Sequence, residues 1–399
     1  MENDFYNRII YKKNAFLELK DYLKHNYDGK KVLIISTKDM VNNHLTEIMN
    51  CVSLSSCTFK HFISKNNFSN YELKQLCEML TFENFDVYIV YGEDKAVMVA
   101  KYFANIFCVP YIVCPSSCGC LACFSNVCVN PYDCTRSFNC EFPDKIFISE
   151  SVVKTSSLDS IKQSVYFILS LEEMLAMASF ENILFDKQID RSQIIKNILK
   201  LQKELKSIMS GDSEAKLILM DIVIDTTYEL EKVNMFEWST FNLYTLMKKI
   251  FLNSNNYSSN GEIVLLSSKI LLLCYKNLFL QKKIKQLEFP NFSKIIKNIQ
   301  KNDIFCKKIN NFQYFNSILS KKELLTRLNN LKEEFLYQCN KRIDEQDQML
   351  NIIKSYDDIF THETPKLSDV FSAVNVLPFV CDNNYIVELI GGIGLANSF

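Results

Sequence analysis

The segment FDVYIVYGEDKAVMVAKYFANIFCVPYIVCPSSCGCLACFSNVC, residues 85–128, decides the fold class of this chain. It opens with an uninterrupted apolar run, residues 85–91, which is typical of a strand buried on both faces. After Gly92, apolar residues recur at helical spacing until Pro110 ends the helix. Residues 111–114 then predict a second buried strand. The segment therefore predicts a strand–helix–strand unit, and its first turn is where a nucleotide phosphate would bind.

Strand and helix signals alternate through the first part of the chain. Apolar runs at 9–10, 32–35, 52–64 and 143–148 predict further strands, and helical periodicity at 15–25, 41–50 and 70–82 predicts the helices between them. Such alternation is typical of a parallel sheet. We therefore expect an α/β N-terminal domain, residues 1–156, with a Rossmann-like parallel sheet.

Strand signals nearly vanish after residue 156. Helical periodicity instead continues through 158–186, 191–210, 214–231, 239–252, 262–284 and 320–355, and the charged composition of the last segment predicts one long solvated helix. We therefore expect an all-α helical C-terminal domain, residues 157–399.

Composition narrows the classes of partner. The chain has 399 residues and a net charge of −1, so charge gives no reason to expect nucleic acid or an anionic membrane surface as a partner. The longest apolar run, 263–280, is interrupted by serine, lysine and asparagine, and a bilayer span needs roughly 18 to 20 apolar residues. The chain starts acidic and polar, without the pattern of a signal peptide. The expected location is the cytoplasm.

Several short motifs, in a fixed order along the chain, resemble those of a known family; we call them the motif frame. Asp86 enters the strand before Gly92, and the pairs Ala100-Lys101 and Pro115-Ser116 follow. This frame resembles the nucleotide-binding core of the dehydroquinate synthase-like superfamily, which includes iron-containing alcohol dehydrogenases, glycerol dehydrogenases and glycerol-1-phosphate dehydrogenases. The last group looks most similar because of the long helical extension. The resemblance implies that a metal polarises an alcohol oxygen while hydride passes to NAD(P) across a cleft between domains.

The resemblance implies a cofactor site around the first turn. Its residues would be Gly92, Glu93, Asp94 and Lys95, then Ser116 and Ser117, with Ser36 and Thr37 at the adenine-ribose end. The relatives have glycines where Glu93 and Asp94 stand. A carboxylate about 5 Å from a phosphate costs roughly 1 to 3 kcal/mol at an effective dielectric of about 20 to 80. The alternatives are a helix with an acidic first turn and no ligand, and an ordinary strand-to-helix cap at Ser36 and Thr37.

The resemblance also implies a metal position in the helical domain. The relatives hold zinc, iron or nickel with one aspartate and two histidines. The counterpart of the aspartate looks like Glu173, one histidine position looks like Asn260, and the other would fall within 239–242. No histidine lies between His61 and His362. Such a site would lack the imidazoles that suit first-row metals, and the alternative for Glu173 is a solvated helix residue.

Cysteines crowd the segment after the first turn. Eight of the 15 cysteines lie between Cys108 and Cys140. Cys120 stands where the relatives carry an aspartate that binds substrate hydroxyls, a charged acceptor that cysteine cannot replace. Four thiolates could hold zinc or an iron–sulfur cluster, but the spacing matches no standard pattern. The alternative is that these cysteines are small buried residues in a cysteine-rich loop.

Three hypotheses for function follow. The first is a diverged NAD(P)-dependent polyol or glycerol phosphate dehydrogenase-like oxidoreductase without the usual aspartate–histidine–histidine metal site. The second is a non-catalytic subunit that binds or scaffolds a protein partner. The third is a cysteine-bound metal protein. The sequence assigns no catalytic residue, and it leaves open a small-molecule substrate, a protein partner and assembly as a homo-oligomer.

Overall fold

The computed structural model describes residues 2–41, 43–186, 188–232, 238–253, 260–281 and 320–356, and the single residues 297, 300, 370, 373, 374, 376 and 377. The chain divides into two compact units. The first unit is Met1–Ser164 with Ser207–Glu231, and the second is Val165–Lys206 with Lys232–Phe399. A domain boundary between residues 156 and 157 stays a prediction.

The first unit is built on a six-stranded sheet in the order β1-β8-β5-β4-β2-β3. Its strands are β1 (Ile9–Lys12), β2 (Lys31–Thr37), β3 (Thr58–Ser64), β4 (Val87–Gly92), β5 (Tyr111–Pro115) and β8 (Lys145–Ser149). All neighbouring strands are parallel, which confirms the predicted parallel sheet. Every residue of the two central strands β4 and β5 is buried, as their continuous apolar sequences predict.

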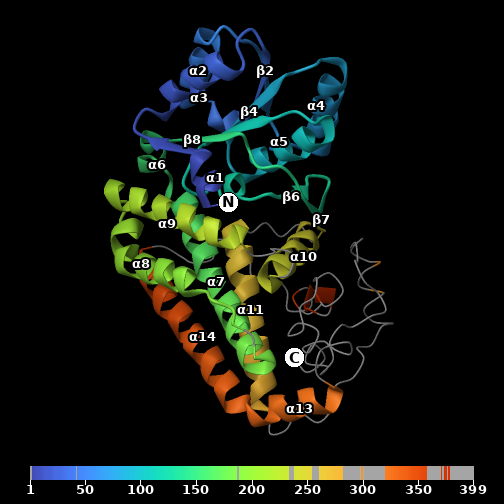
Figure 1. The fold of residues 1–399 in the computed structure, drawn as a ribbon, viewed down its shortest axis with the longest axis vertical. Coiled ribbons are helices and arrows are strands. Elements are labelled where there is room, and N and C mark those ends of the chain that lie inside the picture. The colour runs from blue at the N-terminus through green and yellow to red at the C-terminus, as the bar shows by residue number, and fades with distance from the viewer. Residues whose placement is uncertain are drawn as a thin grey trace. The chain divides into compact units, whose positions relative to one another are not determined.

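Helices cover the sheet of the first unit (Figure 1). The long ones are α2 (Ala15–Asn26), α3 (Asn43–Leu54), α4 (Asn70–Phe82) and α5 (Asp94–Phe107). The unit also contains α9 (Ser213–Glu231), which packs against the short helix α6 (Glu150–Lys154), and the short elements α1 (Glu2–Asn7), η1 (Lys38–Met40) and η2 (Ala122–Phe124). Leu19 of α2 and Ile48 of α3 share a core with Ile34 and Ile89, which are paired on the neighbouring strands β2 and β4. The predicted strand at 52–64 is wrong in its first half, because α3 continues to Leu54.

A two-stranded hairpin replaces the predicted loop. β6 (Val127–Asn130) and β7 (Asp133–Asn139) pair antiparallel, with an irregular register near Asn130. Asn130 accepts a bond from the backbone N–H of Tyr132 at 2.8 Å and so forms the turn. Val127 and Cys128 are buried. The start of β6 therefore belongs to the core of this unit.

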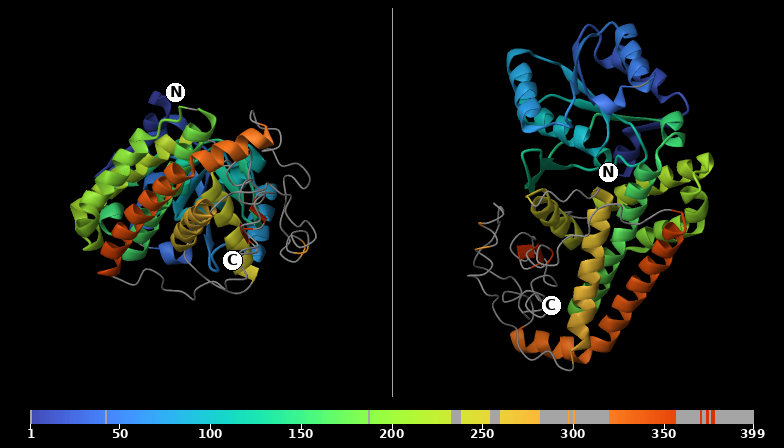
Figure 2. Two further views of the ribbon diagram at one scale, coloured as in Figure 1. Left: turned by 90° about the horizontal axis from the view of Figure 1, so that it is seen from below. Right: turned by 180° about the vertical axis from the view of Figure 1, so that it is seen from behind.

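The second unit contains only helices among its described residues, which confirms the predicted all-α character. They are α7 (Leu158–Phe185), which starts in the first unit, α8 (Ser192–Met209), whose end belongs to the first unit, α10 (Ser239–Asn253), α11 (Asn260–Leu280), α13 (Lys321–Asn330) and α14 (Lys332–Lys354). Figure 2 shows the long helices from two further sides. Phe180, Tyr275 and Phe335 meet edge to face in their core.

Two predictions about these helices need correction. The predicted single helix 320–355 is two helices, because the chain leaves helical geometry at Leu331. The helix α13 has its own capping box between Ser320 and Glu323. The predicted end of the helix 262–284 lies outside the described residues after 281.

One described helix, α11, is long and apolar enough to cross a membrane by length and composition. The expectation that no run reaches that length is therefore wrong. Most of the helix is nevertheless buried inside the structure, including Glu262, Ser267 and Ser268. It packs against α10 and α14, and a core helix of a globular protein has the same composition.

Candidate functional sites

The turn after β4 has the tight geometry that the sequence predicts. Gly92 pairs with Pro115 across the sheet, and its carbonyl accepts the backbone N–H of Ser116 at 3.1 Å. A Cβ atom on Gly92 would lie 2.8 Å from the Cβ of Ala96, so only glycine fits without a shift. The turn therefore brings the start of α5 beside the segment that follows β5.

Both carboxylates of this turn are engaged inside the first unit. Glu93 Oε1 accepts the hydroxyls of Ser117 at 3.3 Å and Ser160 at 3.2 Å. Asp94 Oδ1 accepts the backbone N–H of Ala122 at 2.7 Å, and its Oδ2 accepts the side-chain amide of Gln163 at 2.8 Å. These bonds fasten the first turn of α5 to the segment 117–122 and to the start of α7. The acidic side chains thus stand where the relatives are expected to have glycine.

The other predicted cofactor residues have mixed environments. Ser36 is buried and its hydroxyl donates to the carbonyl of Tyr91 at 2.7 Å, so it joins two strands. Thr37 is buried at the start of η1 and makes no side-chain cap bond there. Lys95 is exposed. The Ser116 hydroxyl is buried without a hydrogen-bond partner among the described residues. Binding of a cofactor by these residues stays a prediction.

Cys120, the predicted substrate residue, is completely buried. The thiol of Cys123 lies beside it and donates to its backbone carbonyl at 2.9 Å. The hydrogen bond with Cys123, burial, and the carboxylates of Asp94 and Glu93 together raise the pKa of the Cys120 thiol well above its usual value. Cys120 is therefore a neutral thiol and does not supply the charged acceptor of the relatives.

A buried carboxylate with three donors lies in the second unit. Glu173 is fully buried in α7, so the alternative of a solvated helix residue is wrong. Its Oε2 accepts the indole N–H of Trp238 at 3.1 Å and the hydroxyl of Thr240 at 2.9 Å. Its Oε1 accepts the hydroxyl of Tyr275 at 2.6 Å. Burial raises the pKa of Glu173, and these three bonds oppose that rise by stabilising the charged form. We call these four residues the Glu173 cluster.

The two histidine positions implied by the resemblance have separate contacts. Thr240, within the segment 239–242, is the residue that reaches Glu173. Ser239 donates to the sulfur of Met177, and Asn260 accepts the hydroxyl of Tyr244 at 3.1 Å. Sequence reasoning identified the segment and the carboxylate but missed Tyr275 as a donor.

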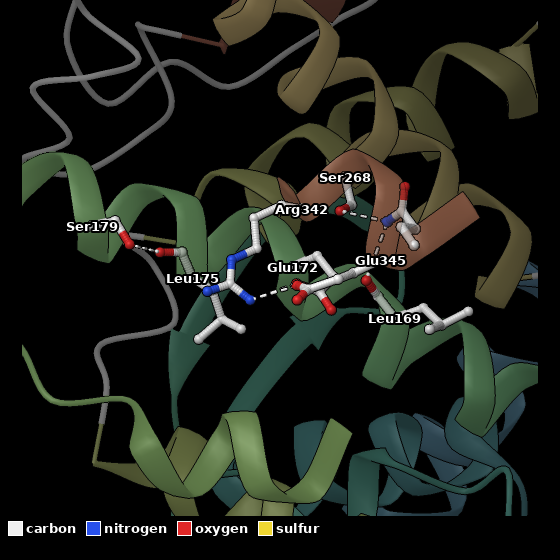
Figure 3. A network of polar contacts seen from close by, with 8 residues as sticks. Leu169, Glu172, Leu175, Ser179, Ser268, Arg342 and Glu345 are labelled. Carbon is white, nitrogen blue, oxygen red and sulfur yellow. Dashed lines mark hydrogen bonds and ion pairs between the residues drawn. The ribbon is translucent and has the colours of Figure 1, made fainter. Parts of the chain in front are cut away.

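A second buried acid stands next to the cluster in sequence. Glu172 is fully buried, and its Oε2 lies 3.3 Å from Nη1 of Arg342, which also binds Glu345 at 2.8 Å (Figure 3). The other oxygen, Oε1, is buried without a hydrogen-bond partner among the described residues. Burial raises the pKa of Glu172 to about 7, and the charge of Arg342 opposes the rise. Two adjacent carboxylates in an otherwise apolar stretch of α7 were the sequence signal for this network.

The described residues contain no group of three or more histidine, cysteine, aspartate or glutamate side chains that could hold a metal ion. Glu173 is surrounded by neutral donors, and Cys118, Cys120 and Cys123 are free buried thiols. The geometry therefore gives no support to the hypothesis of a cysteine-bound metal protein within this part of the chain.

Comparison with solved structures identifies the fold. An iron-containing alcohol dehydrogenase is similar at a TM-score of 0.58 and 12% identity, covering 98% of this chain and 97% of that one. Glycerol dehydrogenase from Schizosaccharomyces pombe is similar at a TM-score of 0.52 and 15% identity, and the match covers 87% of this chain and 90% of that one. NADH-dependent butanol dehydrogenase A from Thermotoga maritima is similar at a TM-score of 0.51 and 12% identity, and the match covers 94% of this chain and 97% of that one.

Identities this low establish the fold alone. No family model and no curated protein matches the sequence. The predicted closeness to glycerol-1-phosphate dehydrogenases in particular stays a prediction. The chain has the fold of the iron-containing alcohol dehydrogenases and glycerol dehydrogenases, as the motif frame predicts.

Proposed function

We propose that this chain is a diverged dehydrogenase-fold protein that has lost metal-dependent alcohol oxidation and acts as a binding or scaffolding subunit. The single observation that carries the proposal is the Glu173 cluster. A carboxylate at the position implied for a metal ligand is bonded to three donors of the protein itself. The chain keeps the fold while using this carboxylate for its own structure.

The donor set around Glu173 does not fit a first-row metal ion. The indole N–H of Trp238 is a donor only and cannot coordinate a cation. Hydroxyls of Thr240 and Tyr275 are weak ligands compared with imidazole or thiolate. A metal ion would also have to displace hydrogen bonds of 2.6 to 3.1 Å to a buried carboxylate. No step of a metal-dependent reaction is therefore assigned to these residues.

The turn after β4 supports the same proposal. Glu93 and Asp94 hold serine hydroxyls, a backbone N–H and a glutamine amide of the first unit. A pyrophosphate at this turn would meet two carboxylates, each at a cost of roughly 1 to 3 kcal/mol. The helix N-terminus still favours an anion, by about 0.3 to 1 kcal/mol in exposed settings. The exposed Lys95 would offset part of this repulsion. The attraction of the helix terminus is smaller than the repulsion of the two carboxylates.

A turnover assay tests the proposal. The purified protein is mixed with NAD⁺ or NADP⁺ and with alcohols, glycerol, propanediols and glycerol 1-phosphate, separately with zinc, iron, nickel and a chelator. We expect no cofactor reduction above the protein-free rate under any condition. Sustained turnover that needs a metal and stops with the chelator would overturn the proposal. An intact alcohol dehydrogenase of the same fold is the positive control.

The second candidate is an NAD(P)-dependent oxidoreductase that uses other groups. The tight Gly92 turn favours this candidate, as does the Ser116 hydroxyl beside it, which has no hydrogen-bond partner among the described residues, because both could serve a phosphate. It differs from the first proposal in one measurable property, which is saturable binding of NADH or NADPH.

A further inference from the structure

One side of α8 is exposed and basic. Its opposite side is buried through apolar residues at helical spacing: Ile194, Ile198, Leu201 and Leu205. The exposed side carries four lysines and two apolar residues within roughly 140° of the helix circumference: Ile195, Lys196, Leu199, Lys200, Lys203 and Lys206. None of the exposed residues of α8, which is described over its whole length, is acidic. We call these six residues the basic face.

The exposed side of α14 is acidic over its first three turns (Figure 1). Its exposed residues lie within roughly 100° of the helix circumference and are Glu333, Glu334, Tyr337, Lys341 and Asp344. Three acids and one lysine give these residues a net charge of −2. We call these five residues the acidic face.

Two ion pairs join these faces to neighbouring residues of the same helix. Lys203 Nζ lies 3.9 Å from a carboxylate oxygen of Glu204, and the Lys203 side chain is 82% exposed. Lys332 Nζ lies 3.9 Å from a carboxylate oxygen of Glu333, whose side chain is also 82% exposed. Exposed ion pairs contribute little to stability, so a partner of opposite charge competes with them easily.

The two faces match in charge and in length. The lysines of the basic face span residues 196–206, which is about 15 Å of helix. The acids of the other face span the same length between residues 334 and 344. Each face also presents a large side chain among its charges, since Leu199 is 56% exposed and Tyr337 is 59% exposed. A tyrosine within a polar surface is typical of protein–protein interfaces.

We propose that the basic face of α8 binds the acidic face of α14 in a second copy of this chain. Both surfaces occur on every copy, and their opposite charges favour each other over a like surface. Because the two faces differ, a two-fold dimer contains the contact twice, and copies that join head to tail contain it once per junction. The proposal gives a location to the homo-oligomer that the sequence leaves open.

Other anionic partners fit the basic face less well. A helix that binds a membrane surface inserts its apolar side, and the apolar side of α8 is already buried in the protein. Surfaces that bind nucleic acid combine lysine with arginine and aromatic residues, and the fully described basic face has neither. The inference uses no residue of the Glu173 cluster or of the turn after β4, so it stands or falls independently of the proposed function.

Sedimentation velocity of the full-length chain tests the proposal. The measurement is made in about 50 mM and about 500 mM salt, a change that shortens the reach of exposed charges about threefold. We expect an assembly of two or more chains at low salt that dissociates at high salt. A chain that is monomeric at low salt, or an assembly whose affinity does not depend on salt, would overturn the proposal.

Reversal of charge assigns the two faces. The basic-face variant combines Lys196→Glu, Lys200→Glu and Lys206→Glu. The acidic-face variant combines Glu334→Lys and Asp344→Lys. Each variant alone should associate at least about tenfold more weakly than the unmutated chain, because like charges then meet. The two variants mixed in equal amounts should associate again, because each mixed contact joins opposite charges.

A matched control separates the basic face from net charge. Lys13→Glu, Lys24→Glu and Lys74→Glu together reverse three exposed lysines of the first unit, and this control should associate as the unmutated chain does. Fluorescence of Trp238 checks that each variant is folded, and the salt dependence of the unmutated chain decides the question if a variant is not. Mixed variants that stay monomeric would overturn the proposal. So would a monomeric chain whose basic face binds phosphatidylserine vesicles instead.

Discussion

Removal of one hydroxyl tests the Glu173 cluster. Tyr275→Phe deletes the 2.6 Å donor to Glu173 Oε1 and leaves the ring in its core contacts with Phe180. Hydrogen bonds to charged groups contribute about 1.5 to 3 kcal/mol, and the carboxylate oxygen stays buried without that donor. We therefore expect the free energy of unfolding to fall by about 2 to 3 kcal/mol near neutral pH.

The sole tryptophan of the chain reports on this loss directly. Trp238 donates to the same carboxylate, so its fluorescence during urea unfolding follows the helices around Glu173. Tyr244→Phe is the matched control, because its hydroxyl donates to a neutral amide, Asn260, in a partly buried place. Its expected cost is about 0.5 to 1.5 kcal/mol. If Tyr275→Phe cost no more than this control, Glu173 would not be a charged acceptor.

The pH dependence of the stability of Tyr275→Phe follows from the direction in which the pKa of Glu173 is shifted. Burial raises the pKa of Glu173, and the hydrogen bond from Tyr275 opposes the rise. Losing that bond raises the pKa further, so the protonated form persists to higher pH. A group with a raised pKa stabilises the fold at low pH and loses that contribution as pH rises through the folded pKa. The cost of Tyr275→Phe should therefore be greater at about pH 8 than at about pH 5.

Three further changes have defined outcomes. Because the pKa of Glu172 is raised from 4.5 to about 7, stability should fall as pH rises across that window, and Glu172→Gln should flatten the slope measured by urea midpoints. Burial of Glu72 is outweighed by hydrogen bonds from backbone N–H groups and a serine, which lower its pKa to about 2. The contribution of Glu72 to stability is present above pH 4.5 and is lost as pH falls toward 2. Glu72→Gln should therefore lower the free energy of unfolding by about 1 to 3 kcal/mol near neutral pH and by less in acid, as measured by urea unfolding at both pH values. Gly92→Ala should lower the free energy of unfolding by about 1 to 3 kcal/mol, because the new Cβ would lie 2.8 Å from that of Ala96. Adding Ala96→Gly should restore part of the lost melting temperature. Equal stability of the single and double variants would contradict that packing.

The fold was predictable where one local pattern determined the structure. Strands buried on both faces, such as β4 and β5, leave no polar alternation and are therefore distinct from amphipathic helices in the sequence. The hairpin of β6 and β7 was missed because cysteines resemble both loop and core residues. The break at Leu331 was missed because it interrupts two helices with similar periodicity by a single residue.

The candidate sites were predictable only in part. The segment 239–242 and Glu173 could be placed from the family resemblance, and Thr240 of that segment does bind Glu173. The burial of Glu173 could not be predicted, because it depends on Tyr275, which lies 102 residues further along the chain. Cys128 was noticed as a cysteine, but its place opposite Phe138 depends on a hairpin that the sequence did not predict. Partners distant in sequence become visible only in the folded chain.

A calorimetric titration with NADH, repeated with NADPH, tests the central claim most directly. We propose that Glu93 and Asp94 occupy the phosphate turn of the dehydrogenase fold with the protein's own hydrogen bonds. We therefore expect no saturable heat with either cofactor at concentrations up to about 1 mM, which corresponds to binding weaker than about −4 kcal/mol. Saturable binding at micromolar cofactor would contradict the account and favour an active oxidoreductase.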